Sequence, residues 1–426
     1  MISKIPRGQL YFQPWASLRD LFGQSLSAGP KVEEFEAEAA SVLQTEQALS
    51  YPHARVALHD LLAELIQKGE LRPGDQVLMT PITIPDIVNV VLDAGLVPVW
   101  VDLGERTANI DTQDLERKLN AKSRVLLLTH LCGFASDMDA VMQLSKGRGL
   151  ILLEDCSQIM GGSYRGRALG SFGRAAIYSL TSMKPVSSFH GGLLTTSDVD
   201  LAAALRQQIG QLHAPKRSKF LSFFGRDMLM FMASHPTLFS LFGFWIMSLL
   251  ELLSPRLVAQ FQRGNFLFFK GGASRARRRR LPQSMFVHYT DLQAAIASRT
   301  LAALESGNQQ RRRLGEQLLG LLEAQDLPGR PLLLDSTEPT FWRFPYWTDE
   351  PAKLRRFLRR RGIDSARTNL ICASNESAFS PFAAATPQAS AFVDSMVFLP
   401  MHPNLNQAHM QRMGSAIAAY HAQGGR

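Results

Sequence analysis

The chain has 426 residues, of which 46% are hydrophobic and 19% charged, so it can bury a large core in two or three domains and is not intrinsically disordered. Its three cysteines are odd in number and widely spaced, which argues against a disulfide framework, and without a CxxC pair or a His/Cys cluster we expect no metal site. The net charge of +9 has a local origin, because residues 215–281 hold twelve lysines and arginines against two acids, while the remainder is close to neutral.

In chain order, residues 1–15 lack the apolar core of a secretory signal, so we expect a cytoplasmic protein. Apolar runs then alternate with amphipathic segments. Buried strands are predicted at residues 77–80, 97–101, 124–129 and 149–153, with helices at residues 32–43, 56–68, 86–94, 114–119 and 138–145. Strands that alternate with helices predict an α/β fold with a mostly parallel sheet.

The chain is organised around residues 154–192. Glu154 and Asp155 end the predicted strand 149–153, at the carboxyl edge where open α/β sheets bind ligands. Lys184 is the only charged residue between Ala175 and Phe189. A lysine that can hold pyridoxal phosphate (PLP) covalently, plus a carboxylate that keeps its ring nitrogen protonated, is what a PLP site requires. The alternative is an ordinary strand-end cap and a solvated lysine.

The order of several short motifs resembles the core of the DegT/StrS family of PLP-dependent sugar aminotransferases, which have the fold-type I aminotransferase fold. The matching elements are Glu154-Asp155-x-x-Gln158, Gly170-Ser-Phe-Gly173, Tyr178-Ser179, Lys184 and Gly191-Gly192. This resemblance implies a large PLP-binding domain over residues 1–212, with a seven-stranded mixed sheet flanked by helices. It also implies a small α+β domain over residues 284–426 and a homodimer.

The resemblance also implies roles for individual residues. Lys184 would hold PLP and move protons between cofactor and substrate. Asp155 would pair with the pyridinium nitrogen, and Gln158 would contact the 3-oxygen of the ring. Ser179 and Arg55 would bind the phosphate, although Arg55 is equally interpretable as a first-turn surface residue.

Four positions depart from the family pattern. Relatives usually have Ser-Gly-Thr at the phosphate-binding helix start, an aromatic residue that stacks on the ring, a glutamate before Gly-Gly, and Asn-Tyr/Phe-Arg before the connecting helix. The corresponding residues here are His53-Ala54-Arg55, Ile84, His190 and Phe286-Val287-His288. Ala54, Ile84 and His288 are therefore expected at altered cofactor contacts. His190 would face substrate or hold a loop, and the loop interpretation is the favoured one.

Residues 213–283 have no counterpart in the usual family pattern and form a predicted apolar and basic insertion. Residues 228–250 carry no formal charge and would suffice in length for a bilayer span. Pro236 and Gly243 interrupt them, and catalytic segments lie on both sides, so interfacial helices or a re-entrant hairpin turning near His235 fit better. Basic clusters at residues 216–219 and 275–280 favour an anionic membrane surface, contacted through residues 216–280. A buried insertion or dimer contact remains open, whereas the arginine run without a nucleic-acid fold makes nucleic acid the least favoured partner.

The predicted function is transfer of an amino group from a donor, often glutamate in this family, to a keto sugar. That sugar would be nucleotide-linked or, if the insertion holds the enzyme on a membrane, lipid-linked. One alternative is a degenerate scaffold or regulatory protein that no longer binds PLP. Another is dehydration on the same fold, which is disfavoured because relatives that only dehydrate usually replace the lysine with histidine, and Lys184 is present.

Overall fold

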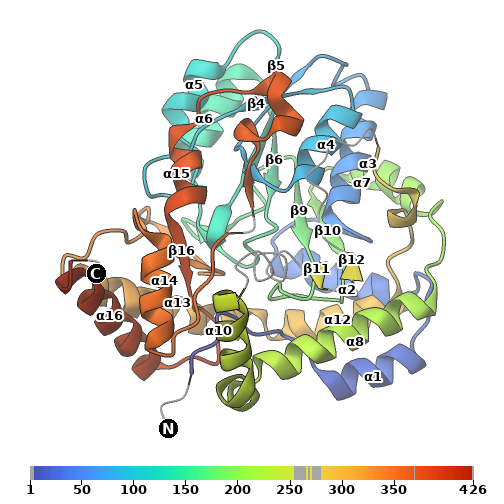
Figure 1. The fold of residues 1–426 in the computed structure, drawn as a ribbon. Helices are drawn as coiled ribbons and strands as arrows, with labels where there is room; N and C mark the ends of the chain where they lie inside the picture. Colours follow the sequence, from blue (N-terminus) through green and yellow to red (C-terminus); the bar gives the residue numbers. More distant parts are fainter. Residues whose placement is uncertain (1–3, 254–264, 267–268, 271–279, 369, 425–426) are drawn as a thin grey trace.

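The computed structural model describes residues 4–253, 265–266, 269–270, 280–368 and 370–424. Its centre is a seven-stranded sheet in the order β1-β10-β9-β6-β5-β2-β4 (Figure 1). The strands are β1 (Gln47–Tyr51), β2 (Gln76–Met79), β4 (Val97–Trp100), β5 (Ser123–Thr129), β6 (Ile151–Asp155), β9 (Ala175–Ser179) and β10 (Gly192–Thr196). Strands β9, β6, β5, β2 and β4 run parallel, and β10 runs antiparallel to both of its neighbours. The predicted seven-stranded mixed sheet is thus confirmed.

Helices cover both faces of this sheet, which explains why its strands read as continuous apolar runs. In β5, Leu126 and Leu128 pack toward α2, whereas Val125 and Leu127 pack toward α3 and α4. The helices of this part are α1 (Pro14–Gly23), α2 (Pro30–Val42), α3 (Ala54–Gln67), α4 (Pro85–Asp93), α5 (Thr112–Lys118), α6 (Met138–Arg148) and α7 (Val199–Ile209).

Side chains at helix starts distinguish α3 from its neighbours. Asp111, Asp137 and Asp198 cap α5, α6 and α7 by accepting a backbone N–H of the first turn. His53, the residue before α3, makes no such bond. The first turn of α3 therefore keeps amide donors at the carboxyl edge of the sheet, where an anion is favoured.

The C-terminal part forms its own α+β core. Its helices are α12 (Asp291–Ala302), α13 (Leu304–Glu323), α14 (Pro351–Arg360), α15 (Pro387–Ser395) and α16 (Gln407–Ala422). Strands β14 (Phe344–Trp347) and β16 (Met396–Leu399) pair antiparallel, and β15 (Ile371–Cys372) pairs with β3 (Ile82–Thr83) of the large part. The remaining short strands are β7 (Ser163–Tyr164), β8 (Arg167–Ala168), β11 (Asn265–Phe266), β12 (Phe269–Lys270) and β13 (Thr337–Glu338).

The sequence run Phe341–Trp347 predicts a strand, but the observed strand β14 begins only at Phe344. Residues 341–343 instead turn along the segment after β5, where the Arg343 amide donates to the Cys132 carbonyl at 3.1 Å. This turn moves Trp342 and Arg343 out of the sheet.

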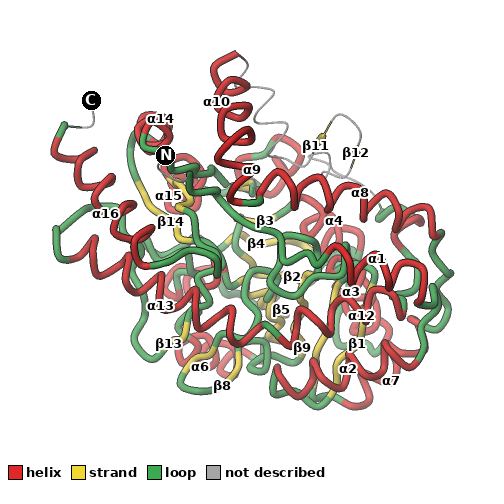
Figure 2. Tube along the Cα trace, turned by 90° about the horizontal axis from the view of Figure 1, so that it is seen from below, coloured by secondary structure: helices red, strands yellow, loops and turns green. Residues whose placement is uncertain are grey.

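Residues 217–253 are helical: α8 (Arg217–Ser234), α9 (Pro236–Leu238), a π-helical turn at Phe239–Gly243 and α10 (Phe244–Leu253). The chain bends at His235, between α8 and α9. Among the described residues no single helix has the length and hydropathy to cross a membrane, but the bent pair Arg217–Ser234 and Pro236–Ile246 meets both requirements together, with a 62° bend. In Figure 2, α10 stands out from the body of the molecule. Most of the predicted basic cluster 275–280 lies outside the described residues.

Candidate active site

The predicted acid and the predicted lysine lie close enough to interact. Asp155, the last residue of β6, is buried and accepts the Ser157 N–H at 3.0 Å. Lys184 lies in the loop between β9 and β10, and its Nζ is 3.6 Å from the centre of the Trp342 ring. Burial first, and then the positive charge of Arg343, lowers the pKa of Lys184 to about 7, while Asp155 opposes that shift. A lysine held partly neutral at pH 7 is chemically prepared to attack a carbonyl carbon.

The start of α3 packs tightly against the start of β10. A Cβ on Gly192 would lie 2.3 Å from the Ala54 nitrogen, so the second glycine of the Gly-Gly pair is required for this approach. Ser179 lies opposite Gly192 across the β9–β10 pair. Its hydroxyl and the amides of α3 are therefore gathered at one edge of the sheet, as a phosphate site needs.

Arg55 is not a free surface residue. Its guanidinium forms an ion pair with the buried carboxylate of Asp86, which ties the start of α3 to the start of α4. Ile84 is the residue immediately before α4 and packs, half-buried, against the core on the α3 side of the sheet. Any phosphate contact of Arg55 would therefore be shared with Asp86.

Gln158 has a partner within the chain. Its side-chain oxygen accepts the Cys132 N–H at 2.9 Å, and the Cys132 carbonyl in turn accepts the N–H of Arg343. Gln158 thus fixes the segment along which Trp342 and Arg343 lie. The sequence does not predict these two residues as part of the site, because they read as the beginning of a strand. The local signal against that strand is the run Phe341-Trp342-Arg343, which breaks its alternation of apolar and polar residues.

The side chain of His190 is buried and packs against neighbouring rings. Its Nδ1 lies 3.2 Å from the Pro52 carbonyl oxygen, and its ring stacks between His53 and Phe220 with centroid distances of 5.1 and 5.6 Å. Burial is the main cause that lowers the pKa of His190 to about 4. These contacts support the loop-holding interpretation over contact with substrate.

His288 lies in a different setting. Its N–H donates to the His213 carbonyl at 2.8 Å, and burial and then His213 lower the pKa of its half-buried ring. In the described part of the chain no hydrogen bond or ion pair connects His288 to Lys184, Asp155 or Ser179. Among the described residues His288 thus has no polar contact with these three predicted site residues.

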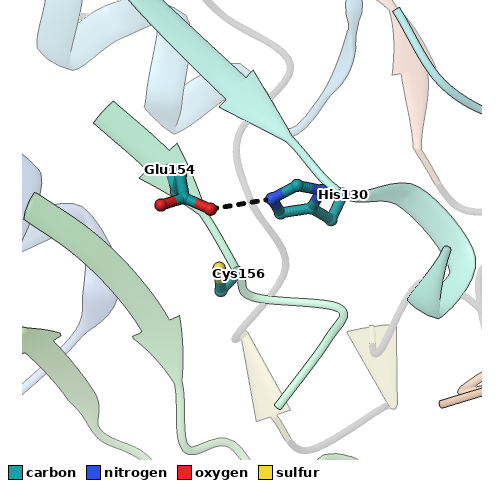
Figure 3. Close-up of side chains that lie close together, drawn as sticks. All are labelled: His130, Glu154 and Cys156. Atoms are coloured by element: carbon teal, nitrogen blue, oxygen red, sulfur yellow. Dashed lines mark hydrogen bonds and ion pairs between the residues drawn. The ribbon is translucent and has the colours of Figure 1, made fainter. Parts of the chain in front are cut away.

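Glu154 explains the Gly170-Ser-Phe-Gly173 motif. It lies on the opposite face of β6 from Asp155 and accepts the N–H groups of Gly170, Phe172 and Gly173 at 2.7–2.8 Å. His130 Nε2 lies 3.1 Å from the same carboxylate, beside Cys156 (Figure 3). Because both carboxylate oxygens are engaged and burial raises the pKa of the Cys156 thiol, this group is better explained as an anchor for the Gly170–Gly173 turn than as a metal site.

Helix α8 holds the lysine loop from outside. The buried carboxylate of Asp227 accepts the Ser182 hydroxyl at 2.5 Å and the Arg226 Nε–H at 2.8 Å. Arg226 also donates to the Ser182 oxygen at 2.7 Å and to the Phe189 carbonyl at 3.3 Å. We call these three side chains, Ser182, Arg226 and Asp227, the α8 latch. Beside it, Tyr11, Pro185, Phe231 and Arg311 line a cavity of about 330 Å³.

The sequence and the fold were compared with those of known proteins. The sequence model of the DegT/DnrJ/EryC1/StrS aminotransferase family matches residues 18–231 and 269–418. The match therefore extends further into residues 213–283 than the motifs predict and leaves residues 232–268 outside it.

Three named relatives are sugar-biosynthesis proteins or sugar aminotransferases. The spore coat polysaccharide biosynthesis protein SpsC of Bacillus subtilis is 34% identical over 181 residues, 42% of this chain and 46% of that protein. GDP-perosamine synthase of Caulobacter vibrioides is 33% identical over 191 residues, 45% and 50% of the two chains. The dTDP-3-amino-3,4,6-trideoxy-alpha-D-glucose transaminase of Streptomyces venezuelae is 27% identical over 393 residues, 91% and 86% of the two chains. The aligned region thus spans about half the length of the first two relatives.

Solved structures establish the fold. S. venezuelae DesV superimposes with a TM-score of 0.71 at 24% identity, covering 98% of this chain and 99% of that one. The aminotransferase PseC of Helicobacter pylori superimposes with a TM-score of 0.73 at 18% identity, covering 99% and 100%. The fold is therefore that of fold-type I PLP aminotransferases.

The residues of this site fit PLP. Lys184 is available as the covalent attachment point, Asp155 as the partner of the ring nitrogen, and the uncapped start of α3 as the phosphate site. The fit departs from the family pattern at Ile84, which offers an aliphatic surface in place of a stacking ring.

Proposed function

Because the chain belongs to the DegT/DnrJ/EryC1/StrS aminotransferase family, we propose that it is a PLP-dependent aminotransferase that moves an amino group from an amino acid onto a keto sugar. The observation that carries this proposal is Lys184, whose pKa is lowered to about 7 beside the buried carboxylate of Asp155. PLP supplies an electron sink for the carbon that gains or loses a proton.

The chain's own groups divide the remaining work. Lys184 would hold the cofactor, and its amine would take and return the proton at the reacting carbon. Asp155 would keep the ring nitrogen protonated, while Ser179 and the first amides of α3 would hold the phosphate, with Arg55 contributing beside Asp86. Retention of Lys184 disfavours dehydration alone.

Absorbance and product analysis test this proposal. We expect the protein to take up PLP and show a visible band that borohydride abolishes, and we expect Lys184→Ala to lack the band while the surface control Lys122→Ala keeps it. Incubation with glutamate and nucleotide-linked keto sugars should give an amino sugar by mass spectrometry. A protein that stays colourless with added PLP would identify a scaffold, and a deoxygenated product without nitrogen would identify a dehydratase.

We propose a homodimer as the working form, because residues 286–288 stand where relatives have Asn-Tyr/Phe-Arg, and the asparagine of that motif, which matches Phe286, contacts the neighbouring subunit's phosphate. Sedimentation at micromolar concentration should give about twice the mass of one chain. A monomer that retains PLP and activity would refute this.

We further propose that residues 217–253 seat the enzyme peripherally on the cytoplasmic face of an anionic membrane. Of the fourteen large apolar side chains that are exposed in the described residues, nine lie between Leu221 and Leu249, with Phe242 61% and Trp245 58% exposed. Two more, Trp15 and Phe22, lie on α1, which packs against α8. Figure 1 shows α1, α8 and α10 along one side of the molecule.

Charge favours a lipid surface over a second copy of the chain as the occupant. Residues 215–281, the wider stretch of sequence that includes this apolar face, hold twelve basic residues and two acids, a surplus of positive charge that repels a second copy and attracts anionic head groups. The cavity of about 330 Å³ is lined mainly by residues 9–13 and 300–311, and Phe231 of α8 and Pro185 of the lysine loop also line it, so we infer that a lipid-linked keto sugar approaches from this side.

Vesicle flotation tests the membrane proposal. The wild type should float with vesicles containing about 30% phosphatidylglycerol and remain in the pellet with neutral vesicles. The double change Trp245→Ser with Phe242→Ser should abolish flotation, whereas Leu332→Ser, at an exposed apolar residue away from this face, should not. Concentration-dependent association of the wild type, without flotation, would show that a second copy covers this face instead.

A further inference from the structure

A basic surface lies in the C-terminal part, on α14 (Pro351–Arg360). Its apolar residues recur at helical spacing, and Leu354, Phe357 and Leu358 are buried in the core. Most of the other positions are cationic. Residues 351–361 hold no acid and six basic residues, which are Lys353, Arg355, Arg356, Arg359, Arg360 and Arg361. Three of these, Lys353, Arg356 and Arg360, are exposed, so α14 presents a basic face to solvent.

Nearby acids offset only part of this charge. In the sequence of α14 and the turn that follows it, the only acid is Asp364, which is buried and shared. Arg7 donates to it through two bonds of 2.7 Å, and the guanidinium of Arg359 lies 3.6 Å from it. On the other side of α14, Glu350 pairs with Lys353 at 2.5 Å. The basic face thus keeps a surplus of positive charge, which attracts an anionic partner.

This basic face adjoins the exposed apolar helix α10. The N–H of Lys4 donates to the Ser240 hydroxyl in the turn before α10 at 3.1 Å, and its Nζ lies 5.0 Å from the centre of the Phe244 ring. The next residue, Ile5, donates its N–H to the carbonyl of Gly362, just after α14, at 2.9 Å. Figures 1 and 2 both show α14 beside α10, and in Figure 2 the two helices lie at the same edge of the molecule.

An anionic lipid surface is the partner that uses both helices. Interfacial binding grows with the apolar area that is buried and with the attraction of neighbouring cations to lipid phosphates. On α10, Trp245 is 58% and Leu249 55% exposed, which suits the first requirement. The arginines of α14 suit the second, because a guanidinium can bind a phosphate through two hydrogen bonds. A nucleic acid would bind the arginines but leave α10 exposed, and a symmetric dimer through this face would bring like charges together.

We propose that α14 binds the phosphates of anionic lipids while α10 contacts the acyl region beside it. The proposal rests on the membrane association proposed above and extends it, because the C-terminal part then holds the lipid surface together with residues 217–253. The membrane contact has two components, which are apolar on α10 and electrostatic on α14.

Vesicle partitioning tests α14 against a matched control. Arg356→Gln with Arg360→Gln removes two exposed cations and leaves the buried side of the helix unchanged. One basic side chain near an anionic surface contributes about 5-fold to partitioning, so the pair should weaken binding to vesicles with about 30% phosphatidylglycerol roughly 25-fold. Lys146→Gln with Arg148→Gln removes the same charge from α6, which both figures show away from α10, and should change binding by less than about twofold.

A conservative variant and a stability measurement keep the result specific. Arg356→Lys with Arg360→Lys keeps the charge and should retain most of the binding. The Tm of both glutamine variants should stay within about 1 °C of the wild type, because exposed substitutions of this kind change stability little.

Three outcomes would count against the proposal. Equal partitioning of the α14 and α6 variants would overturn the role of α14 and leave the membrane association standing. Absence of vesicle binding by the wild type would refute the membrane association itself. Binding of a DNA duplex of about 20 base pairs that the α14 change abolishes, with vesicle partitioning unchanged, would identify nucleic acid as the partner instead.

Discussion

The α8 latch gives the most direct test of how α8 supports the active site. Asp227 is 1% exposed and is the acceptor for both Ser182 and Arg226. Replacement by alanine leaves the Ser182 hydroxyl and the Arg226 guanidinium without that partner, and each lost charge-assisted bond costs about 1.5–3 kcal/mol. Because the Arg226 side chain is 27% exposed and can turn to water, we expect a total loss of about 2–3 kcal/mol. Unfolding entropy of about 2.1 cal/mol/K per residue, over 426 residues, converts this loss to a fall in Tm of about 2–3 °C.

The assay combines calorimetry with the visible band of the PLP-loaded protein. If the latch positions the lysine loop, Asp227→Ala should also weaken PLP retention, because Ser182 lies two residues before Lys184. Asp227→Asn should show a smaller effect, since the amide oxygen still accepts one bond, and Glu46→Ala should serve as an exposed control with no effect. An unchanged Tm together with unchanged PLP retention in Asp227→Ala would refute this account of α8.

Three further changes test other parts of the site. The neutral amine of Lys184 is the form that reacts with PLP. The rate of PLP capture, measured by trapping with borohydride, should therefore rise with pH through about 7 and level off above 8. A lysine with an ordinary pKa would have ~10³-fold less neutral amine at pH 7. Gly192→Ala places a methyl group against the Ala54 nitrogen and should weaken PLP binding by about 10-fold in an absorbance titration, with wild-type affinity counting against the tight contact. Glu154→Gln turns one accepting oxygen into a donor, so chemical denaturation should show a loss of about 2–4 kcal/mol, and an unchanged midpoint would contradict the anchoring role.

The sequence by itself determined the sheet and the chemical centre. Apolar strands alternating with helices force a parallel arrangement, and parallel strands bring their carboxyl ends to one edge. Asp155 at the end of β6 and Ser179 at the end of β9 therefore had to meet there. The order of the short motifs then predicted Lys184 as the residue that holds PLP, because a covalent PLP site requires a lysine near that edge.

Only the tertiary structure decided what surrounds this centre. Trp342 and Arg343 reach Lys184 across about 160 positions of sequence, through a turn that local patterns read as strand. The sequence left Arg55 as either a phosphate ligand or a first-turn surface residue, whereas the structure pairs it with Asp86, 31 residues later. The loop-holding position of His190 and the support given by Asp227 likewise depend on where α8 packs. These contacts join segments that are distant in the sequence and form through tertiary packing, so the spacing of residues along the chain does not predict them.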